Sequence, residues 1–166
     1  MTRRQRAMWT SWMIATAVAW SACGSDVNEL SVSTPDRAEF TMTVYPILLR
    51  DCAFFACHSS TERFLQVFGP GRGRLSAATK ALDPELDTEI LHSYDRARSM
   101  IDANDPEKSL LLRKPLEVGA GGTGHQGADH MGRNVYQDAT DPSYVAIKHW
   151  VLGSASASAN TAGSVR

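Results

Sequence analysis

Two cysteines and a histidine stand within one seven-residue stretch of the sequence, CAFFACH. Cys52 and Cys57 are separated by four residues, and His58 follows the second cysteine directly. Two thiols and an imidazole at this spacing permit three chemistries: a disulfide that closes a small loop, a zinc site completed by a fourth ligand, or covalent attachment of a cofactor whose metal the histidine binds. The remaining cysteine, Cys23, lies far from this stretch, and three cysteines are too few for a disulfide framework.

The order Cys-Cys-His is similar to the attachment signature of c-type haem, in which two cysteines form thioethers with the porphyrin and the next histidine binds the iron. One short turn then sets both attachment and axial ligation. The common spacing between the two cysteines is two residues rather than four. The sequence predicts covalent haem c on Cys52 and Cys57 with His58 as the proximal ligand, and Phe54 and Phe55 lining or flanking the haem edge.

A second axial ligand is expected from the Gly-rich loop of residues 119–133, which contains His125, His130 and Met131. We take His125 as the first candidate and Met131 as the second. His130 or an open coordination site completes the alternatives. Methionine ligation raises the reduction potential relative to a second histidine, whereas an open site admits small ligands to the iron.

The elements that must position these residues are predicted to be helices. Three Asp-Pro pairs, at 83–84, 105–106 and 141–142, each place an N-cap oxygen before a proline that fits the first helical turn. The apolar spacing predicts a helix from the first pair to about Asp102. It predicts a short helix from the second pair that stops at Pro115, and a third helix that ends at Gly153.

An earlier segment, AEFTMTVYPILLRD, carries Phe40, Val44 and Leu48 at helical spacing, with Pro46 either kinking the helix or starting its second half. No convincing alternating strand is present. The fold class is therefore predicted to be mainly α, with a long Gly-rich loop from about Leu116 to Thr140.

The two ends of the chain differ in composition from its body. A basic head, an apolar stretch from Ala7 to Trp20 and small residues before Cys23 are typical of a secretory signal of the lipoprotein type. A transmembrane anchor, or ordinary cleavage after Ala17 or Ala19, is the alternative. We expect a signal peptide at 1–22, a lipidated Cys23, a tether at 23–37, a folded body at 38–153 and a disordered tail at 154–166.

Charge excludes some partners. The chain has 17 Lys and Arg against 18 Asp and Glu, and without its first 22 residues it is mildly acidic. Such a chain has no electrostatic affinity for phosphate backbones, so nucleic acid is not expected as a partner. Export predicts a location in the cell envelope, facing the periplasm or the exterior, with membrane attachment through the lipid anchor alone.

Four blocks of the sequence resemble planctomycete-type cytochrome c domains of exported bacterial proteins. In chain order they are VYPILLRDCAFFACHSS, DPEKSLLLRKP, GHQG and DPSYVAIKHWVLG, and together they span about residues 40–153. The resemblance implies a cytochrome c-like helical fold, with the first and last helices packed together. It also implies electron transfer to a redox partner protein in the envelope rather than catalysis. The alternative is a non-redox envelope lipoprotein whose body holds a disulfide or zinc and acts as a binding module.

Residues 70–85 depart from the short form of that family and are predicted to be an insertion. Arg72 and Arg74 in this segment could pair with the haem propionates, because guanidinium suits carboxylate geometry. A solvated turn is the simpler interpretation. His92 and His149 are expected to be exposed on helices, and neither is a candidate ligand.

Overall fold

The structure is a computed structural model that describes residues 34–125 and 134–162. In these two ranges the chain is mainly helical and has no β-strand, the nearest feature being an isolated bridge between Leu116 and Tyr136. The predicted α class is therefore confirmed at this level. The expected signal peptide, Cys23, His130 and Met131 lie outside the described residues.

The first helical segment consists of α1 (Arg37–Glu39), the π-helical turn η1 (Phe40–Val44) and α2 (Tyr45–Asp51). Pro46 has no N–H, so it cannot donate to the carbonyl four residues earlier as a continuous α-helix requires. The wide turn directly before Pro46 accommodates the missing hydrogen bond, because the Tyr45 N–H bonds to the Phe40 carbonyl, five residues back. Pro46 thus begins the second half of the segment, one of the two outcomes predicted.

The helix α3 (Asp87–Arg98) begins later than predicted. Asp83 does not cap it, because the Asp83 carboxylate accepts a hydrogen bond from the Lys80 N–H at 2.9 Å and closes a turn there. The first helical turn is instead closed by Glu89, whose side chain reaches back to the Leu86 N–H. An Asp-Pro pair marks a helix start only where the aspartate is not already bonded upstream.

The second and third Asp-Pro pairs do begin helical elements. The 3₁₀ turn η2 (Pro106–Lys108) leads into α4 (Leu110–Arg113), and a further 3₁₀ turn, η3 (Val118–Ala120), follows. Asp141 caps α5 (Pro142–Ala162) by accepting from the Ser143 and Tyr144 N–H groups. The helix continues past Gly153, so the predicted end there is wrong. The Ala- and Ser-rich residues that follow contain no proline and can extend a helix at small cost.

An aromatic cluster joins the first segment, α3 and α5. The Phe40 ring lies 5.2 Å from the Trp150 ring and 5.4 Å from the Tyr94 ring, measured between centroids. The polar ends of the cluster bond to the chain just before α1, with the Tyr94 hydroxyl donating to Pro35 O and the Trp150 indole to Asp36 O, both at 2.7 Å. The folded body therefore includes the last residues of the predicted tether.

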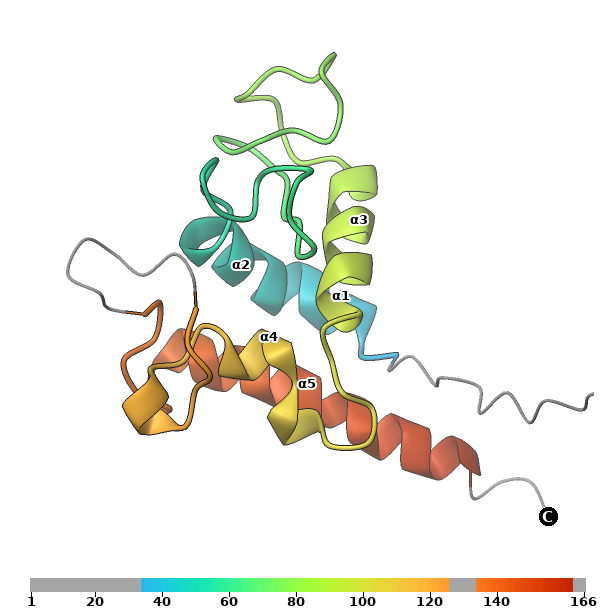
Figure 1. Cartoon of the computed structure of the whole chain (residues 1–166). Helices are drawn as coiled ribbons and strands as arrows, with labels where there is room; N and C mark the ends of the chain where they lie inside the picture. Colours follow the sequence, from blue (N-terminus) through green and yellow to red (C-terminus); the bar gives the residue numbers. More distant parts are fainter. Residues whose placement is uncertain (1–33, 126–133, 163–166) are drawn as a thin grey trace, which may run out of the picture. The chain divides into compact units, whose positions relative to one another are not determined.

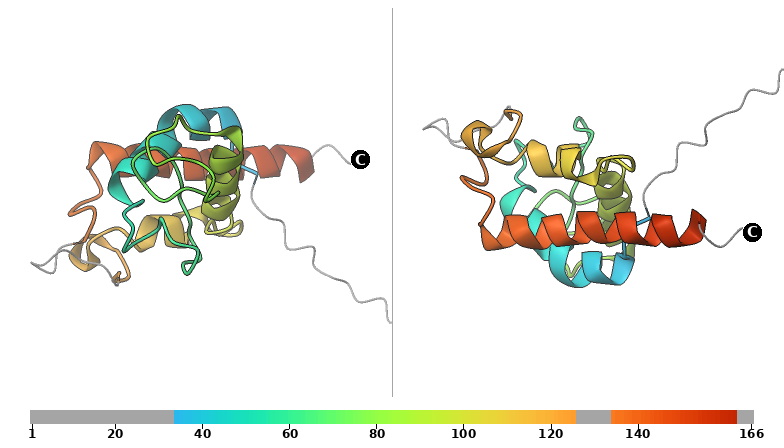
Figure 2. Two further views of the ribbon diagram at one scale, coloured as in Figure 1. Left: turned by 90° about the horizontal axis from the view of Figure 1, so that it is seen from above. Right: turned by 90° about the horizontal axis from the view of Figure 1, so that it is seen from below.

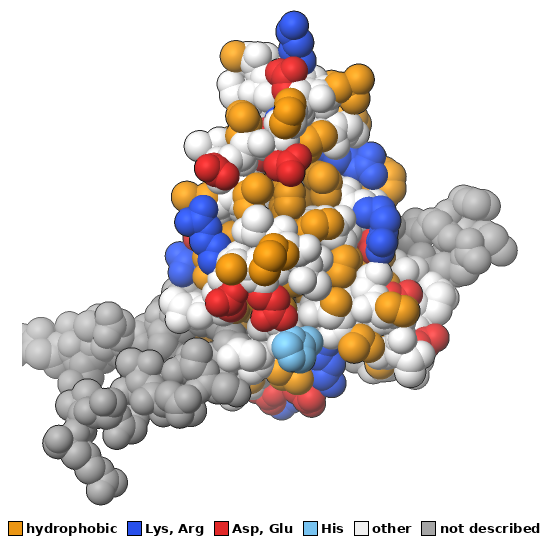
Figure 3. All heavy atoms as spheres, turned by 180° about the vertical axis from the view of Figure 1, so that it is seen from behind, with side chains coloured by type: hydrophobic (Ala, Val, Ile, Leu, Met, Phe, Trp, Pro, Cys, Tyr) orange, Lys and Arg blue, Asp and Glu red, His pale blue; other side chains and the backbone are white. Residues whose placement is uncertain are grey.

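Figures 1 and 2 show the α1–α2 segment lying alongside α5, with α3 packed steeply against the α1 end. The loop from Cys52 to Leu86 runs between the ends of α2 and α3. On the face shown in Figure 3, acidic, basic and hydrophobic side chains are interspersed. Packing of the first segment against α5 agrees with the expectation that the first and last helices of the body meet.

A buried ion pair holds the end of this loop to α3. The Arg74 Nη2 and Glu89 Oε2 atoms are 2.7 Å apart, and both side chains are almost completely inaccessible to solvent. Arg74 also donates to the carbonyls of Lys80, Asp83 and Pro84. Neither a solvated turn nor a propionate contact describes Arg74, because all of its donors are used within the protein.

Candidate functional site

The turn after α2 brings the two cysteines and the histidine into one place. Cys52 is the C-cap of α2, and its carbonyl accepts from the His58 N–H at 3.2 Å. The Cys57 N–H donates to the Phe54 carbonyl at 2.8 Å. The four residues between the cysteines therefore form two nested hydrogen-bonded turns, which hold Cys52, Cys57 and His58 in one local structure.

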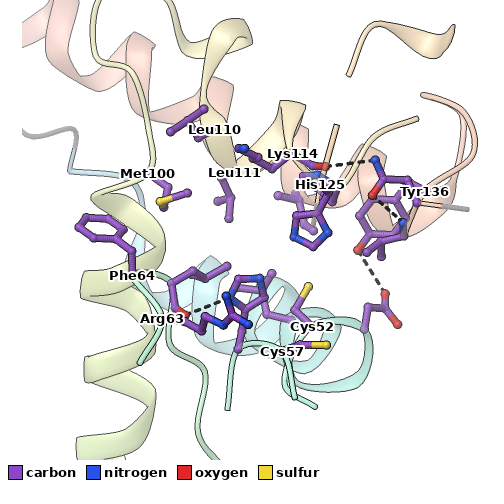
Figure 4. A pocket seen from close by; sticks show the side chains of 18 of the residues that line it. Cys52, Cys57, Arg63, Phe64, Met100, Leu110, Leu111, Lys114, His125 and Tyr136 are labelled. Carbon is purple, nitrogen blue, oxygen red and sulfur yellow. Dashed lines mark hydrogen bonds between the residues drawn. The ribbon is translucent and has the colours of Figure 1, made fainter. Parts of the chain in front are cut away.

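A cavity of about 700 Å³ lies between this turn, the loop that follows it and α4. Its wall is mostly apolar, with Leu48, Leu65, Leu111 and Ile147 among the lining residues. Cys52, Cys57, His58 and His125 all line the same cavity. Figure 4 shows the His125 ring entering from the side opposite the two cysteine sulfurs.

His58 is oriented by a backbone contact. Its Nδ1 atom lies 3.0 Å from the Leu65 carbonyl, a position that fixes the proton on Nδ1 and leaves the lone pair of Nε2 available. Burial lowers the pKa of His58 and outweighs the opposing effect of the Leu65 hydrogen bond. The imidazole is thus held neutral, with one fixed tautomer, which is the form that binds a metal.

His125 faces His58 from 67 positions along the chain. The two ring centroids are 5.8 Å apart and the ring planes are inclined by 32°. The Nδ1 atom of His125 is buried and has no hydrogen-bond partner among the residues the structure describes. Burial lowers the pKa of His125, and the nearby positive side chains of Lys114 and Arg63 lower it further.

The separation of the two rings is suited to a shared metal ion. An imidazole nitrogen binds a metal at about 2 Å, so two rings that bind one ion from opposite sides have centroids about 6 Å apart. The observed 5.8 Å matches this arrangement. Over residues 34–125 and 134–162, no three His, Cys, Asp or Glu side chains gather closely enough to hold an ion by themselves. The site provides a pair of facing ligands rather than a complete cage.

The two thiols are free and differ in environment. Cys52 is buried and Cys57 is partly exposed, and no disulfide joins them. Burial raises the pKa of Cys52 to about 12, with smaller contributions from Asp51 and Cys57. The Cys52 thiol is therefore protonated in the folded, cofactor-free chain.

A tyrosine that the sequence did not single out borders the cavity on the cysteine side. The Tyr136 hydroxyl donates to Asp51 Oδ2 at 3.2 Å, and burial strongly raises the pKa of Tyr136. Arg50 forms a two-point contact with the same carboxylate at 2.6 and 2.7 Å. No spacing pattern links positions 51 and 136, so this contact follows only from the tertiary fold.

Of the predicted site residues, Cys52, Cys57, His58 and His125 come together. Phe54 lines the cavity as expected, but Phe55 is exposed and does not. Arg72 and Arg74 are also outside its lining. Arg72 donates to the Leu49 carbonyl and lies 4.6 Å above the Phe54 ring, so its described contacts are with the protein itself.

His92 departs from its predicted exposure. It is partly buried, stacks near Phe68 and bonds through Nε2 to the Gln66 side chain at 2.8 Å. His149 is exposed as predicted and contacts Glu39. Neither lines the cavity.

None of the helices in the described part of the chain has the length and hydropathy required to cross a membrane. Comparison of the chain with protein-family models, with curated proteins and with solved structures found no match.

Proposed function

We propose that this chain binds haem covalently through Cys52 and Cys57 and acts as an electron carrier, with His58 as the proximal ligand and His125 as the second. One observation carries the proposal: His58 and His125, distant in sequence, face each other at 5.8 Å across an apolar cavity that both free thiols border. Among the described residues, His58 has one hydrogen-bond partner, the Leu65 carbonyl, and the buried Nδ1 of His125 has none. A metal between the rings supplies the missing partner.

The residues present fit this cofactor in three respects. The cavity volume lies within the range of about 300–1,000 Å³ typical of small-molecule and cofactor sites, and its wall is mostly apolar. The buried Nδ1 of His125 lacks a protein partner among the described residues. Two facing ligands are also the number that a haem iron takes from a protein, because the porphyrin occupies the other four positions.

The chain's own residues have distinct tasks in this proposal. Each attachment adds a thiol across a vinyl group: the sulfur bonds to one vinyl carbon and the thiol hydrogen goes to the other, so no oxidant is consumed. The Leu65 carbonyl holds the His58 tautomer, and the leucine-rich wall excludes water. Bound haem supplies a one-electron couple at its iron. Two histidine ligands leave no open position on the iron, which favours a carrier over a catalyst.

Lipidation of Cys23 and export to the cell envelope complete the proposal. Because the cofactor is covalently bound, an anchored carrier does not lose it to the surroundings outside the cytoplasm. Its partner is a redox protein of the envelope, and nucleic acid is not expected to bind.

The test is an absorption spectrum of the full chain exported in a host with a cytochrome c maturation system, followed by a haem stain of a denaturing gel. A Soret band that shifts on reduction, with stain migrating with the protein, is the expected result. The Cys52→Ala/Cys57→Ala variant should lose the stain. His92→Ala is the matched control, because His92 is a partly buried histidine outside the cavity, and this variant should keep both signals.

A folded but colourless protein contradicts electron transfer. Thiol titration and metal analysis of that protein then separate the two alternatives. Blocked thiols without metal indicate a Cys52–Cys57 disulfide, and one equivalent of zinc indicates a metal-stabilised binding module.

A further inference from the structure

Two positively charged side chains border the cavity without an ion-pair partner. Arg63 and Lys114 both line it. Neither forms a salt bridge or a side-chain hydrogen bond with any residue in the described ranges. They belong to different segments, since Arg63 lies in the loop after His58 and Lys114 follows directly on α4.

Some other cations of the same body, outside the cavity, are paired. Arg98 contacts Asp95, Lys108 contacts Asp105 and Lys148 contacts Glu107, all at 3.0 Å or less. Arg63 and Lys114 are exposed to solvent at the border of a mostly apolar cavity, and neither has a counter-charge among the described residues. A cation at the edge of low-dielectric space gains most from a ligand that brings its own negative charge.

Charge is distributed unevenly around the cavity. Among the lining residues that the structure describes, Asp51 is the only carboxylate, and it lies on the cysteine side, where Arg50 and Tyr136 already bind it. Figure 4 shows Arg63 and Lys114 on opposite walls, with Arg63 near Phe64 and Lys114 above Leu111, and Cys52 and Cys57 toward the other end. The described lining therefore offers sulfur and a neutralised acid on one side, and two cations without an ion-pair partner among the described residues on the other.

We propose that Arg63 and Lys114 bind the two propionate carboxylates of haem, one from each wall, and thereby fix the orientation of the macrocycle. The proposal rests on the haem function above and adds a specificity determinant to it. The vinyl groups lie on the edge of the porphyrin away from the propionates, so carboxylates held at Arg63 and Lys114 direct the vinyl edge toward Cys52 and Cys57. The cations thus select for a porphyrin that carries two acids and present its reactive edge to the thiols.

The proximity of both cations to the ligand pair supports this assignment. After burial and the other histidine, Lys114 and Arg63 are the charges that lower the pKa of His125. Arg63 also contributes to the lowered pKa of His58.

The experiment uses the full chain with Cys52→Ala/Cys57→Ala, so that binding is reversible and can be titrated through the Soret band. Haem and haem dimethyl ester, in which both carboxylates are masked, are compared in this parent chain. We expect haem to bind at least about tenfold more tightly than the ester, as for loss of charge-assisted hydrogen bonds. This comparison leaves both cations unchanged and so does not depend on how a cation variant folds.

Arg63→Gln/Lys114→Gln is then added to the parent, and the preference for haem over its ester should disappear. The matched control is Arg98→Gln/Lys148→Gln, which removes the same charge from two cations outside the cavity and should retain the preference. Each single variant, Arg63→Gln or Lys114→Gln, should lose part of the preference for haem over its ester. Far-UV circular dichroism checks the helical content of every variant.

The outcomes separate the two proposals. Equal affinity for haem and ester in the parent chain overturns the role of Arg63 and Lys114 but leaves haem binding intact. An unchanged preference in Arg63→Gln/Lys114→Gln does the same. A folded parent chain in which neither compound's Soret band shifts from its position in free solution overturns both proposals.

Discussion

Two pairs of polar side chains in the described part of the chain differ in how far their hydrogen-bonding groups are satisfied. In the Arg74–Glu89 pair, five hydrogen bonds use all five guanidinium N–H groups, and the two carboxylate oxygens also accept from the Leu75 and Leu86 N–H groups. In the His58–His125 pair, only His58 Nδ1 has a partner within the described part of the chain.

This difference separates a structural contact from a candidate ligand site. Burying a polar group costs free energy unless its hydrogen bonds are replaced. A pair that satisfies itself, such as Arg74–Glu89, is complete without a ligand. A pair that leaves lone pairs directed into a cavity is complete only when something else binds, which is why the histidine pair and not the ion pair carries the functional proposal.

The largest expected effect is on the histidine pair. In haem-loaded protein, His125→Ala should convert the whole population from a six-coordinate, low-spin spectrum to a five-coordinate, high-spin one, because the second ligand is lost. Absorption and electron paramagnetic resonance spectra measure the change. If His125→Ala keeps the low-spin spectrum while Met131→Ala loses it, the second ligand is Met131 and the facing of the two rings has no ligand role.

The next largest effect is on the ion pair. Glu89→Gln leaves the Arg74 charge buried without a counter-charge, and we expect the melting temperature to fall by about 10 °C. Differential scanning calorimetry measures this shift. Glu39→Gln is the matched control, because Glu39 contacts only the exposed His149 in its ion pair and should shift the midpoint little. Equal shifts in both variants would show that the Arg74–Glu89 network contributes no more than a surface contact.

A smaller effect is expected from a single neutral hydrogen bond beside the ion pair. The buried Tyr45 hydroxyl donates to the Phe68 carbonyl at 2.7 Å, so Tyr45→Phe should cost about 1 kcal/mol of unfolding free energy by leaving that carbonyl unpaired. Urea denaturation measures the difference. Tyr144→Phe serves for comparison, since the Tyr144 hydroxyl has no partner among the described residues, and a loss as large as that of Tyr45→Phe would refute the assignment.

The smallest effect is a pH dependence of the haem-free chain. Burial lowers the pKa of His58 and of His125 below the ordinary value of 6.5. Below pH 6.5 the unfolded chain therefore takes up protons that the folded chain does not, and stability should decline as the pH falls from 6.5 toward the folded-state values. Denaturation midpoints at several pH values measure the decline.

In His58→Gln/His125→Gln that decline should become shallower. It should not vanish, because burial also lowers the pKa of His92. His149→Gln, at an exposed position, is the control and should retain the full slope. A slope unchanged by the double variant would show that the two rings do not titrate as a buried pair.

Local features of the fold were predictable from the sequence. The Asp141 cap, the short helix after Pro106 and the core face of α3 at Ile90, Tyr94 and Ala97 all follow from capping and spacing rules that act within a few residues. The Cys52–His58 turn was also accessible, because its ligands are neighbours in the chain. In each case the interactions that decide the structure lie within one or two helical turns.

Long-range pairing was not predictable. From the sequence, Glu89 is interpreted as a favourable negative charge near a helix N-terminus. Only the fold shows that it binds Arg74, 15 residues earlier. The sequence predicts that Asp83 caps a helix, but in the structure its carboxylate accepts a hydrogen bond from the Lys80 N–H instead. Of the candidates in the Gly-rich loop, His125 is the one that lies in the described part of the chain, and spacing alone does not indicate that it lines the cavity.

Trp150 gives the protein an internal optical reporter. It is the only tryptophan after residue 22, since the other three stand at positions 9, 12 and 20 of the expected signal peptide. Its indole is 1% exposed and bonds to Asp36 O at the junction of the first segment with α5, so a processed chain has one emitter in one environment. Blue-shifted emission then reports that this junction is formed. Energy transfer to haem would quench it, so one fluorescence trace can follow folding and cofactor loading together.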